Sequence, residues 1–218
     1  MCRGKKYCTE LGLQIENWSR TSPLVPPQWF GDQIDLFAIA FEYASTGDVP
    51  MSLGVLSKIK NNELREWYCE HGQTSGRFRN KVLKIPRQQK SFPLDPVKSP
   101  NKYMEKVFER DHFTCQYCGI KVISKELLNK YAKIVGSNNF CATGTNQERH
   151  GIVLAFRANA DHILPCNIGG KTNLDNLITC CWSCNYGKAG FTLGQLRLDN
   201  PKNNKFVNLN WHGLSEVL

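Results

Sequence analysis

Apolar side chains recur at helical spacing in the first third of the chain. Three runs show this spacing, and each is interpreted as the core-facing side of a helix. The runs are Ile34, Phe37, Ala38 and Phe41; Leu53, Leu56 and Ile59; and Leu64, Trp67 and Tyr68. Asp32 is expected to cap the first helix, and Gly47 and Pro50 are expected to end it. Residues 1–92 are therefore predicted to form a mainly helical N-terminal region.

The hydrophobic pattern breaks between residues 70 and 100. Residues 70–80 combine glycines, short polar side chains, one aromatic residue and two arginines, which predicts a loop. Prolines then indicate a linker, which we place at residues 93–100. These prolines are Pro86, Pro93, Pro96 and Pro100.

Helical spacing returns after the linker. Ser99 and Pro100 are suited to start a short helix that ends near Arg110. Its apolar side comprises Tyr103, Met104, Val107 and Phe108. A second helix is expected to stop at Gly136, and its apolar side comprises Leu127, Leu128, Tyr131 and Ile134.

The last third contains a short apolar run and an aromatic tail. Residues 152–156 form a continuous apolar stretch, which predicts a strand leading towards Asp161. A further helix is expected from Asn185 towards Leu198. The tail, residues 199–218, is expected to pack back on the body through Trp211 and Leu214.

Composition and charge indicate a globular protein with a polyanionic partner. The chain has 218 residues, of which 41% are hydrophobic, enough for one domain or two small ones. Its net charge is +9 and its sequence pI is about 9.1. Between Arg77 and Arg110, ten Lys or Arg stand against three acids.

The first part of this basic segment has no acid at all. It contains Arg77, Arg79, Lys81, Lys84, Arg87 and Lys90. The segment is either a solvated linker or a surface that follows nucleic-acid phosphates, and we favour the second because it leads directly into a cysteine module.

Two Cys-x-x-Cys pairs are the strongest chemical pattern in the chain. A two-residue spacer lets one tight turn direct both sulfurs at the same ion, and four thiolates close a tetrahedral structural zinc site. We assign the ligands as Cys115, Cys118, Cys181 and Cys184. Cys181 is chosen over Cys180 because only Cys181 has the correct spacing to Cys184.

The remaining cysteines have weaker spacing. Cys141 and Cys166 are expected to pack in the core, as free cysteines commonly do. A second zinc site could in principle be formed by Cys2, Cys8, Cys69 and His71. We do not favour it, because Cys2 and Cys8 lack the tight spacing of a zinc knuckle.

The first residues carry positive charge without an apolar run behind it, so no signal peptide is expected. No window approaches the length of a membrane span, so no membrane association is expected. Short-spaced cysteines in such a chain favour metal ligands in the reducing cytoplasm over disulfides.

The second half of the chain resembles the HNH nuclease family. The resemblance starts at residues 107–111 and the first cysteine pair, and continues through Asp161-His162-Ile163-Leu164-Pro165, Gly169-Gly170 and Asn176-Leu177. It ends at Cys181-Trp182-Ser183-Cys184-Asn185 with Lys188. It implies an α+β fold: a ββα-metal nuclease core at residues 101–198 with a structural zinc, beside the helical region. The spacing from Cys118 to Asp161 exceeds the family core, so residues 124–150 are interpreted as an insertion.

The resemblance also implies roles for single residues. His162 would be the general base, since an imidazole titrates near neutrality. Asp161 and Asn185 would hold Mg²⁺ or Mn²⁺, and Asn185 makes this the H-N-N variant of the motif. Asn176 would hold the loop that orients His162. Adjacent strand residues point to opposite faces, so Asp161 and His162 can serve one cluster only if the strand ends or bends there.

These roles predict a nuclease of double-stranded DNA. Contacts to DNA are expected from Arg77, Arg79, Lys81, Lys84, Lys171 and Lys188. A sequence-specific restriction endonuclease acting as a homodimer is the preferred function, and residues 1–92 would then contribute to recognition. Modification-dependent, homing or phage-type nucleases and nickases are alternatives. A zinc-stabilised DNA-binding module without catalysis is the alternative from another class.

Overall fold

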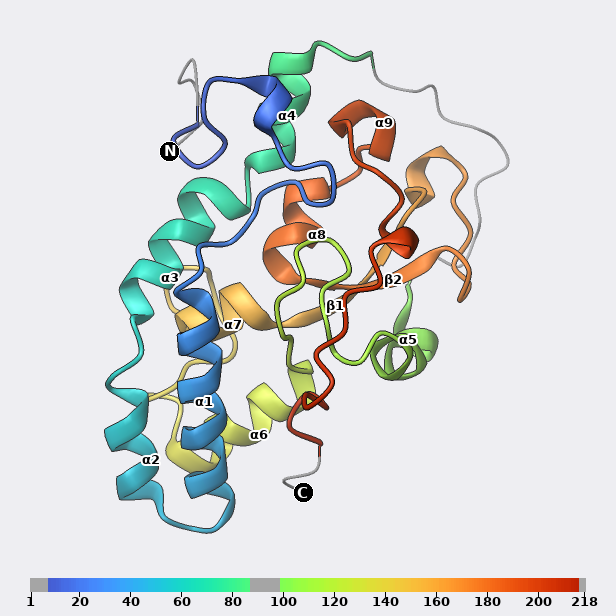
Figure 1. Cartoon of the computed structure of the whole chain (residues 1–218). Coiled ribbons are helices and arrows are strands. Elements are labelled where there is room, and N and C mark those ends of the chain that lie inside the picture. The colour runs from blue at the N-terminus through green and yellow to red at the C-terminus, as the bar shows by residue number, and fades with distance from the viewer. Residues whose placement is uncertain (1–7, 87–98, 216–218) are drawn as a thin grey trace.

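The N-terminal half is a layer of helices. The structure is a computed structural model that describes residues 8–86 and 99–215. The first three helices lie along the left-hand side of the molecule and the fourth lies at its top (Figure 1). They are α1 (Phe30–Ser45), α2 (Val49–Leu56), α3 (Asn61–Trp67) and α4 (Ser75–Leu83), with a 3₁₀ turn at Ile15–Asn17 and a π-helical turn at Tyr68–Gly72.

Two of the expected helix boundaries are wrong. Trp29, and not Asp32, is the N-cap of α1, and Asp32 lies inside the first turn, where its charge suits the helix dipole. Gly47 follows the end of α1 in a left-handed conformation. Pro50, however, lies in the first turn of α2 rather than ending α1, because Asp48 caps α2 by accepting from the Met51 amide.

The loop predicted at residues 70–80 is mostly helical, with a two-residue turn between the π-helical turn that ends at Gly72 and α4, which begins at Ser75. Its glycines serve close packing: a Cβ on Gly76 would lie 1.7 Å from the carbonyl oxygen of Gly187. The backbone of α4 therefore touches the backbone of α8 (Trp182–Lys188). The predicted linker falls largely within residues 87–98, outside the described residues.

The second half contains a two-stranded antiparallel sheet followed by a helix. β1 (Ala158–His162) pairs with β2 (Leu177–Cys181), with His162 opposite Leu177. α8 follows β2 directly. The other helices of this half are α5 (Met104–Arg110), α6 (Lys125–Val135), α7 (Gly151–Phe156) and α9 (Leu193–Leu196), with 3₁₀ turns at Asn101–Tyr103, Cys166–Ile168 and Pro201–Asn203.

α6 ends before Gly136 as predicted. α5 ends at Arg110 as predicted but begins at Met104, after a 3₁₀ turn whose N-cap is Pro100 rather than Ser99. Two other predictions are wrong. The apolar run at residues 152–156 is helix α7, started by the His150 side chain, which accepts from the Ile152 amide. Every residue of α7 is buried, and a short, fully apolar run does not distinguish helix from strand. The helix expected from Asn185 begins earlier, at Trp182, and ends at Lys188.

One hydrophobic core joins the two halves. It contains residues of α1 to α3 together with residues of α6, α7 and α8. Residues 124–150 contribute directly, since the rings of Tyr131 and Phe140 lie 4.9 and 5.3 Å from the ring of Phe37. The tail also joins this core, as predicted: Trp211 is buried and donates to the Val122 carbonyl.

Candidate active site

Four cysteine sulfurs come together beneath the sheet and α8. The Sγ atoms of Cys115, Cys118, Cys181 and Cys184 all lie within 4.8 Å of one another. Cys181 ends β2 and caps α8, where its Sγ accepts from the Cys184 amide. Cys180 stays outside the cluster, with its Sγ directed at the Asn159 carbonyl. This set has the ligand type, number and closeness that a tetrahedral zinc ion requires.

Burial of these sulfurs argues for a cation among them. Burial raises the pKa of Cys118, and contact with the other three thiols raises the pKa of Cys184. Three of these cysteines are buried and Cys118 is half-buried, so the four thiols in mutual contact are poorly solvated, whereas a divalent cation would stabilise them as thiolates.

Asp161 is buried at the end of β1 and is held by two partners. Its Oδ2 accepts from the Tyr117 hydroxyl at 2.8 Å and lies 3.1 Å from Lys188 Nζ. Burial and the adjacent Asp161 charge raise the pKa of Tyr117, so this phenol stays protonated and donates. Among the described residues, Oδ1 has no hydrogen-bond partner, so that oxygen is the ligand atom that Asp161 can offer to a hard cation.

His162 is half-buried and held by a different group. Its Nε2 lies 2.9 Å from the hydroxyl of Thr172. Lys188 donates from Nζ to the His162 carbonyl oxygen at 2.7 Å, so one ammonium touches both residues of the Asp161–His162 pair. The two side chains thus leave the strand end towards different partners, as the alternation along a strand requires.

Asn176 binds the loop that follows β1 at three points. Its Nδ2 donates to the carbonyls of Leu164 and Lys171, and its Oδ1 accepts from the Leu164 amide. Gly170 permits this close arrangement, because a Cβ there would lie 1.8 Å from the Leu164 carbonyl oxygen. The residues between Leu164 and Lys171 are therefore fixed relative to β2, which Asn176 precedes.

Asn185 lies on α8 with a half-buried side chain, one residue after the zinc-type ligand Cys184. The amide oxygen of Asn185 and the carboxylate of Asp161 are hard donors, the chemistry that Mg²⁺ and Mn²⁺ prefer. In chemical type, these two donors would suit a hard divalent ion.

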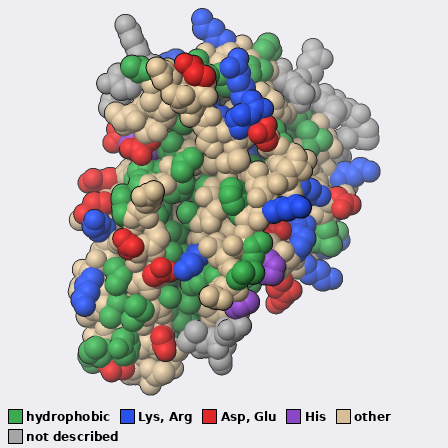
Figure 2. Space-filling view, in the orientation of Figure 1, with side chains coloured by type: hydrophobic (Ala, Val, Ile, Leu, Met, Phe, Trp, Pro, Cys, Tyr) green, Lys and Arg blue, Asp and Glu red, His purple; other side chains and the backbone are tan. Residues whose placement is uncertain are grey.

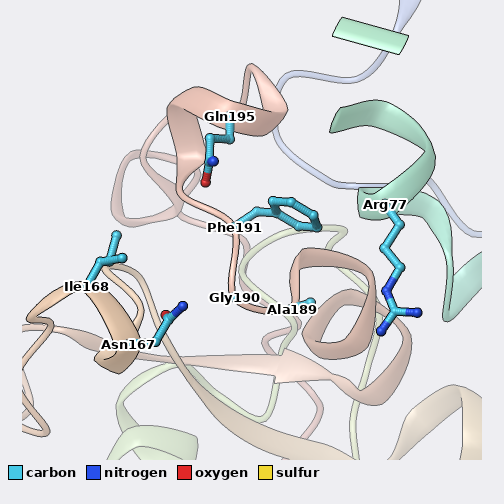
Figure 3. A pocket seen from close by; sticks show the side chains of 7 residues that line it. All are labelled: Arg77, Asn167, Ile168, Ala189, Gly190, Phe191 and Gln195. Carbon is cyan, nitrogen blue, oxygen red and sulfur yellow. The ribbon is translucent and has the colours of Figure 1, made fainter. Parts of the chain in front are cut away.

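The basic side chains divide into exposed and buried groups. Arg77 is exposed on α4 and lines a cleft of about 240 Å³ beside the end of α8 (Figure 3). Asn167, Ile168, Phe191 and Gln195 also line it, so this cleft adjoins the loop that Asn176 fixes. Lys81, Lys84 and Lys171 are exposed as well.

Two predicted DNA contacts are corrected by burial. Arg79 is only 1% exposed, and its guanidinium donates to the carbonyls of Ser19, Ser22 and Leu196. Lys188 is fully buried against Asp161. Both cations bind acceptors of the protein itself, which replaces the predicted phosphate contacts with structural roles.

Two site residues escaped sequence reasoning. Tyr117 lies between the cysteines of the first pair, and nothing in the sequence indicates that its hydroxyl contacts Asp161. Thr172 lies in a polar loop and gave no pattern of its own. Both act through contacts to residues at least ten positions away, which spacing alone does not reveal.

Cys141 and Cys166 are half-buried rather than core residues. Cys166 Sγ lies 3.9 Å from the Thr172 hydroxyl, close to the candidate base. Cys8 Sγ lies 3.6 Å from His71 Nδ1, but no second metal cluster occurs within residues 8–86 and 99–215. Cys2 is outside the described residues.

Residues 151–189 match the family model described as HNH endonuclease. The matched segment runs from α7 through β1 and β2 to the residue after α8, and it contains Asp161, His162, Asn176 and Asn185. The match supports a nuclease domain in this part of the chain. Searches of curated proteins and of solved structures found no match. In the described part of the chain, no helix is long and apolar enough to span a membrane.

Proposed function

We propose that the protein is a metal-dependent endonuclease of double-stranded DNA, with His162 as the general base. The observation that carries this proposal is the strand end at Asp161 and His162, with the loop beyond it fixed by Asn176. The imidazole of His162 would take the proton from the attacking water, and the Thr172 hydroxyl, 2.9 Å from Nε2, would help to orient the ring. The new bond forms between water oxygen and phosphorus, and the bond to the 3′ oxygen breaks, leaving a 5′ phosphate.

Asp161 and Asn185 would hold Mg²⁺ or Mn²⁺. When bound, such an ion stabilises the charge that develops on the phosphate and on the departing oxygen. The positive charge of Lys188 balances the negative charge of the buried Asp161 carboxylate. The same ammonium group holds the backbone carbonyl of His162. The four cysteines would bind one structural zinc, which holds β2 and α8 against the knuckle at residues 115–118.

Arg77, Lys81, Lys84 and Lys171 are proposed to contact DNA, since each is exposed. Figure 2 shows Lys and Arg at separate places over the visible face, most of them in its upper and right-hand parts and some at its left-hand edge, rather than in a single patch. Backbone contacts along an extended track suit such a distribution better than one deep basic pocket does.

A sequence-specific restriction endonuclease in the cytoplasm is our proposal for the biological role. Each chain offers one candidate site, so cutting both strands symmetrically requires a homodimer. Gel filtration with and without a cleaved palindromic duplex tests this arrangement. A dimer on the DNA is expected, whereas a persistent monomer would contradict it.

Digestion of methylated and unmethylated plasmid and phage DNA tests the activity itself. Cleavage is expected with Mg²⁺ or Mn²⁺ and not with EDTA, and sequencing of discrete fragments should show 5′ phosphates at a common sequence. A smear would support a non-specific nuclease, and cutting of methylated DNA alone a modification-dependent one. No cleavage with any ion would support the non-catalytic DNA-binding module.

A further inference from the structure

Buried polar atoms without partners gather around Trp182, at the start of α8. In the described part of the chain, these atoms are the Tyr68 hydroxyl, Arg149 Nε, Arg157 Nε and the Ser183 hydroxyl. Tyr68 lies 6.1 Å from the Trp182 ring, and Ser183 follows Trp182 in the chain. Buried polar groups normally have partners, so such a concentration points to a ligand site.

Two guanidinium groups dominate this cluster. Arg149 and Arg157 lie over the ring of Trp182, with their Cζ atoms 4.8 and 4.5 Å from the ring centroid. Burial lowers the pKa of Arg157, and the neighbouring charge of Arg149 lowers it further. Both positive charges therefore lie against one ring and disfavour each other, and a bound anion would offset this repulsion.

Neither guanidinium is satisfied by the protein. Each carries five N–H donors. Arg149 donates from Nη1 to Asn146 Oδ1, and within residues 8–86 and 99–215 Arg157 makes no side-chain hydrogen bond. No carboxylate within those residues forms an ion pair with either one. This contrasts with Arg79, whose guanidinium is fully engaged by carbonyl oxygens.

The cluster reaches the surface along α8. Tyr186 is 44% exposed, and its ring lies 5.8 Å from that of Trp182. Tyr186 directly follows Asn185, so one short helix carries both the candidate metal ligand and the rim of the arginine cluster.

We propose that Arg149 and Arg157 bind a phosphate of the DNA backbone, at a position away from the cleaved one. This inference rests on the proposed function. Contact with the Trp182 ring leaves N–H donors of both guanidinium groups without a protein partner, and the planar fork of donors on a guanidinium matches two phosphate oxygens.

The position along β1 separates this phosphate from the scissile one. Arg157 precedes His162 by five residues, which in an extended strand corresponds to about 17 Å. The site therefore contacts flanking DNA. It also gives residues 124–150 a role beyond the core, since Arg149 belongs to that segment.

The test is duplex DNA binding in magnesium-free buffer over a range of salt concentrations. Arg149→Gln and Arg157→Gln are each expected to weaken binding about tenfold. Each should also reduce the slope of log K against log salt by about 0.9, the value for one lost phosphate contact. Lys133→Gln, which removes an exposed charge from the same insertion, is the matched control and should have a smaller effect.

Unchanged affinity and slope in folded variants would overturn the inference and leave the two arginines with a purely structural role.

If the variants do not fold, chemical modification of the parent protein by phenylglyoxal provides the test. Bound DNA is expected to protect Arg149 and Arg157 from the reagent, and full modification in the presence of DNA would contradict the proposal. A parent that binds DNA with this protection but never cleaves it would sink the proposed function alone. A parent that cleaves DNA while the variants bind normally would sink this inference alone.

Discussion

Single side chains fix the geometry of the candidate site through the backbone they hold. Asn176 joins three backbone groups of one loop, and Lys188 joins a carboxylate to a carbonyl. Neither acts by presenting itself to solvent. Small displacements of a general base lower rates strongly, so these contacts are where the site is expected to be most sensitive.

Asn176→Asp tests the loop contact with little change in shape. The substitution removes both N–H donations, to Leu164 and Lys171, and places a carboxylate beside two carbonyl oxygens. We expect the single-turnover cleavage rate to fall about 100-fold, as for a base misplaced by about 1 Å. DNA affinity and zinc content should stay at the parent values. A parent-like rate would show that Asn176 does not position His162.

His150 is predicted to make stability depend on pH. Burial lowers the pKa of His150 to about 4, and the charge of Arg65 lowers it further. The unfolded state then binds more protons than the folded state between pH 6.5 and about 4, so stability falls as the pH drops through that window. The full loss is about 3 kcal/mol.

Urea unfolding at pH 7.5 and pH 5 measures this effect. His150→Asn keeps a side chain able to cap α7 but does not titrate, so its stability should change less between the two pH values than that of the parent. Equal changes in both proteins would contradict the prediction.

At the scale of elements, the sequence predicted what depends on neighbours in the chain. α5 and α6 followed from apolar spacing and from end residues such as Gly136. The prediction for residues 152–156 was wrong because a wholly buried helix loses its periodicity. The glycines in residues 70–80 resemble loop hinges in the sequence. Gly76 instead allows contact between α4 and α8, which is not visible until the partner helix is known.

Gly76→Ala tests the contact between α4 and α8. The added Cβ would overlap the Gly187 carbonyl oxygen, so the two helices must separate. We expect a loss of about 3 kcal/mol or more in the free energy of unfolding. Gly54→Ala in α2 is the matched control: nothing lies within 4 Å of its Cβ, and it should stabilise the protein by about 0.5–1 kcal/mol. Similar values for both variants in urea unfolding would refute the contact.

At the scale of the molecule, the cysteine pairs and the ordered motif residues predicted a candidate site from the sequence. Their order is a property of the chain, and the four sulfurs do meet. The shared core could not be predicted in the same way. Contacts such as that between Tyr131 and Phe37 join segments that are far apart in the sequence. These contacts make residues 124–150 part of the core, whereas a surface insertion would lack them.

Metal removal should therefore affect the whole fold. Cys115→Ser is expected to reduce bound zinc from one equivalent per chain towards none, measured by mass spectrometry of the metal, and to lower the thermal midpoint strongly. Cys141→Ser is the control, because this half-buried cysteine lies outside the cluster, and it should keep its zinc. Full zinc content in Cys115→Ser would contradict the assigned ligands.

The most direct test of the account compares His162→Ala with the parent in Mg²⁺-dependent plasmid cleavage. DNA affinity and zinc content are measured on the same samples. The account predicts that the variant binds DNA and zinc like the parent and cuts at least about 100-fold more slowly, the contribution of a general base. A variant that cuts as fast as the parent would contradict it.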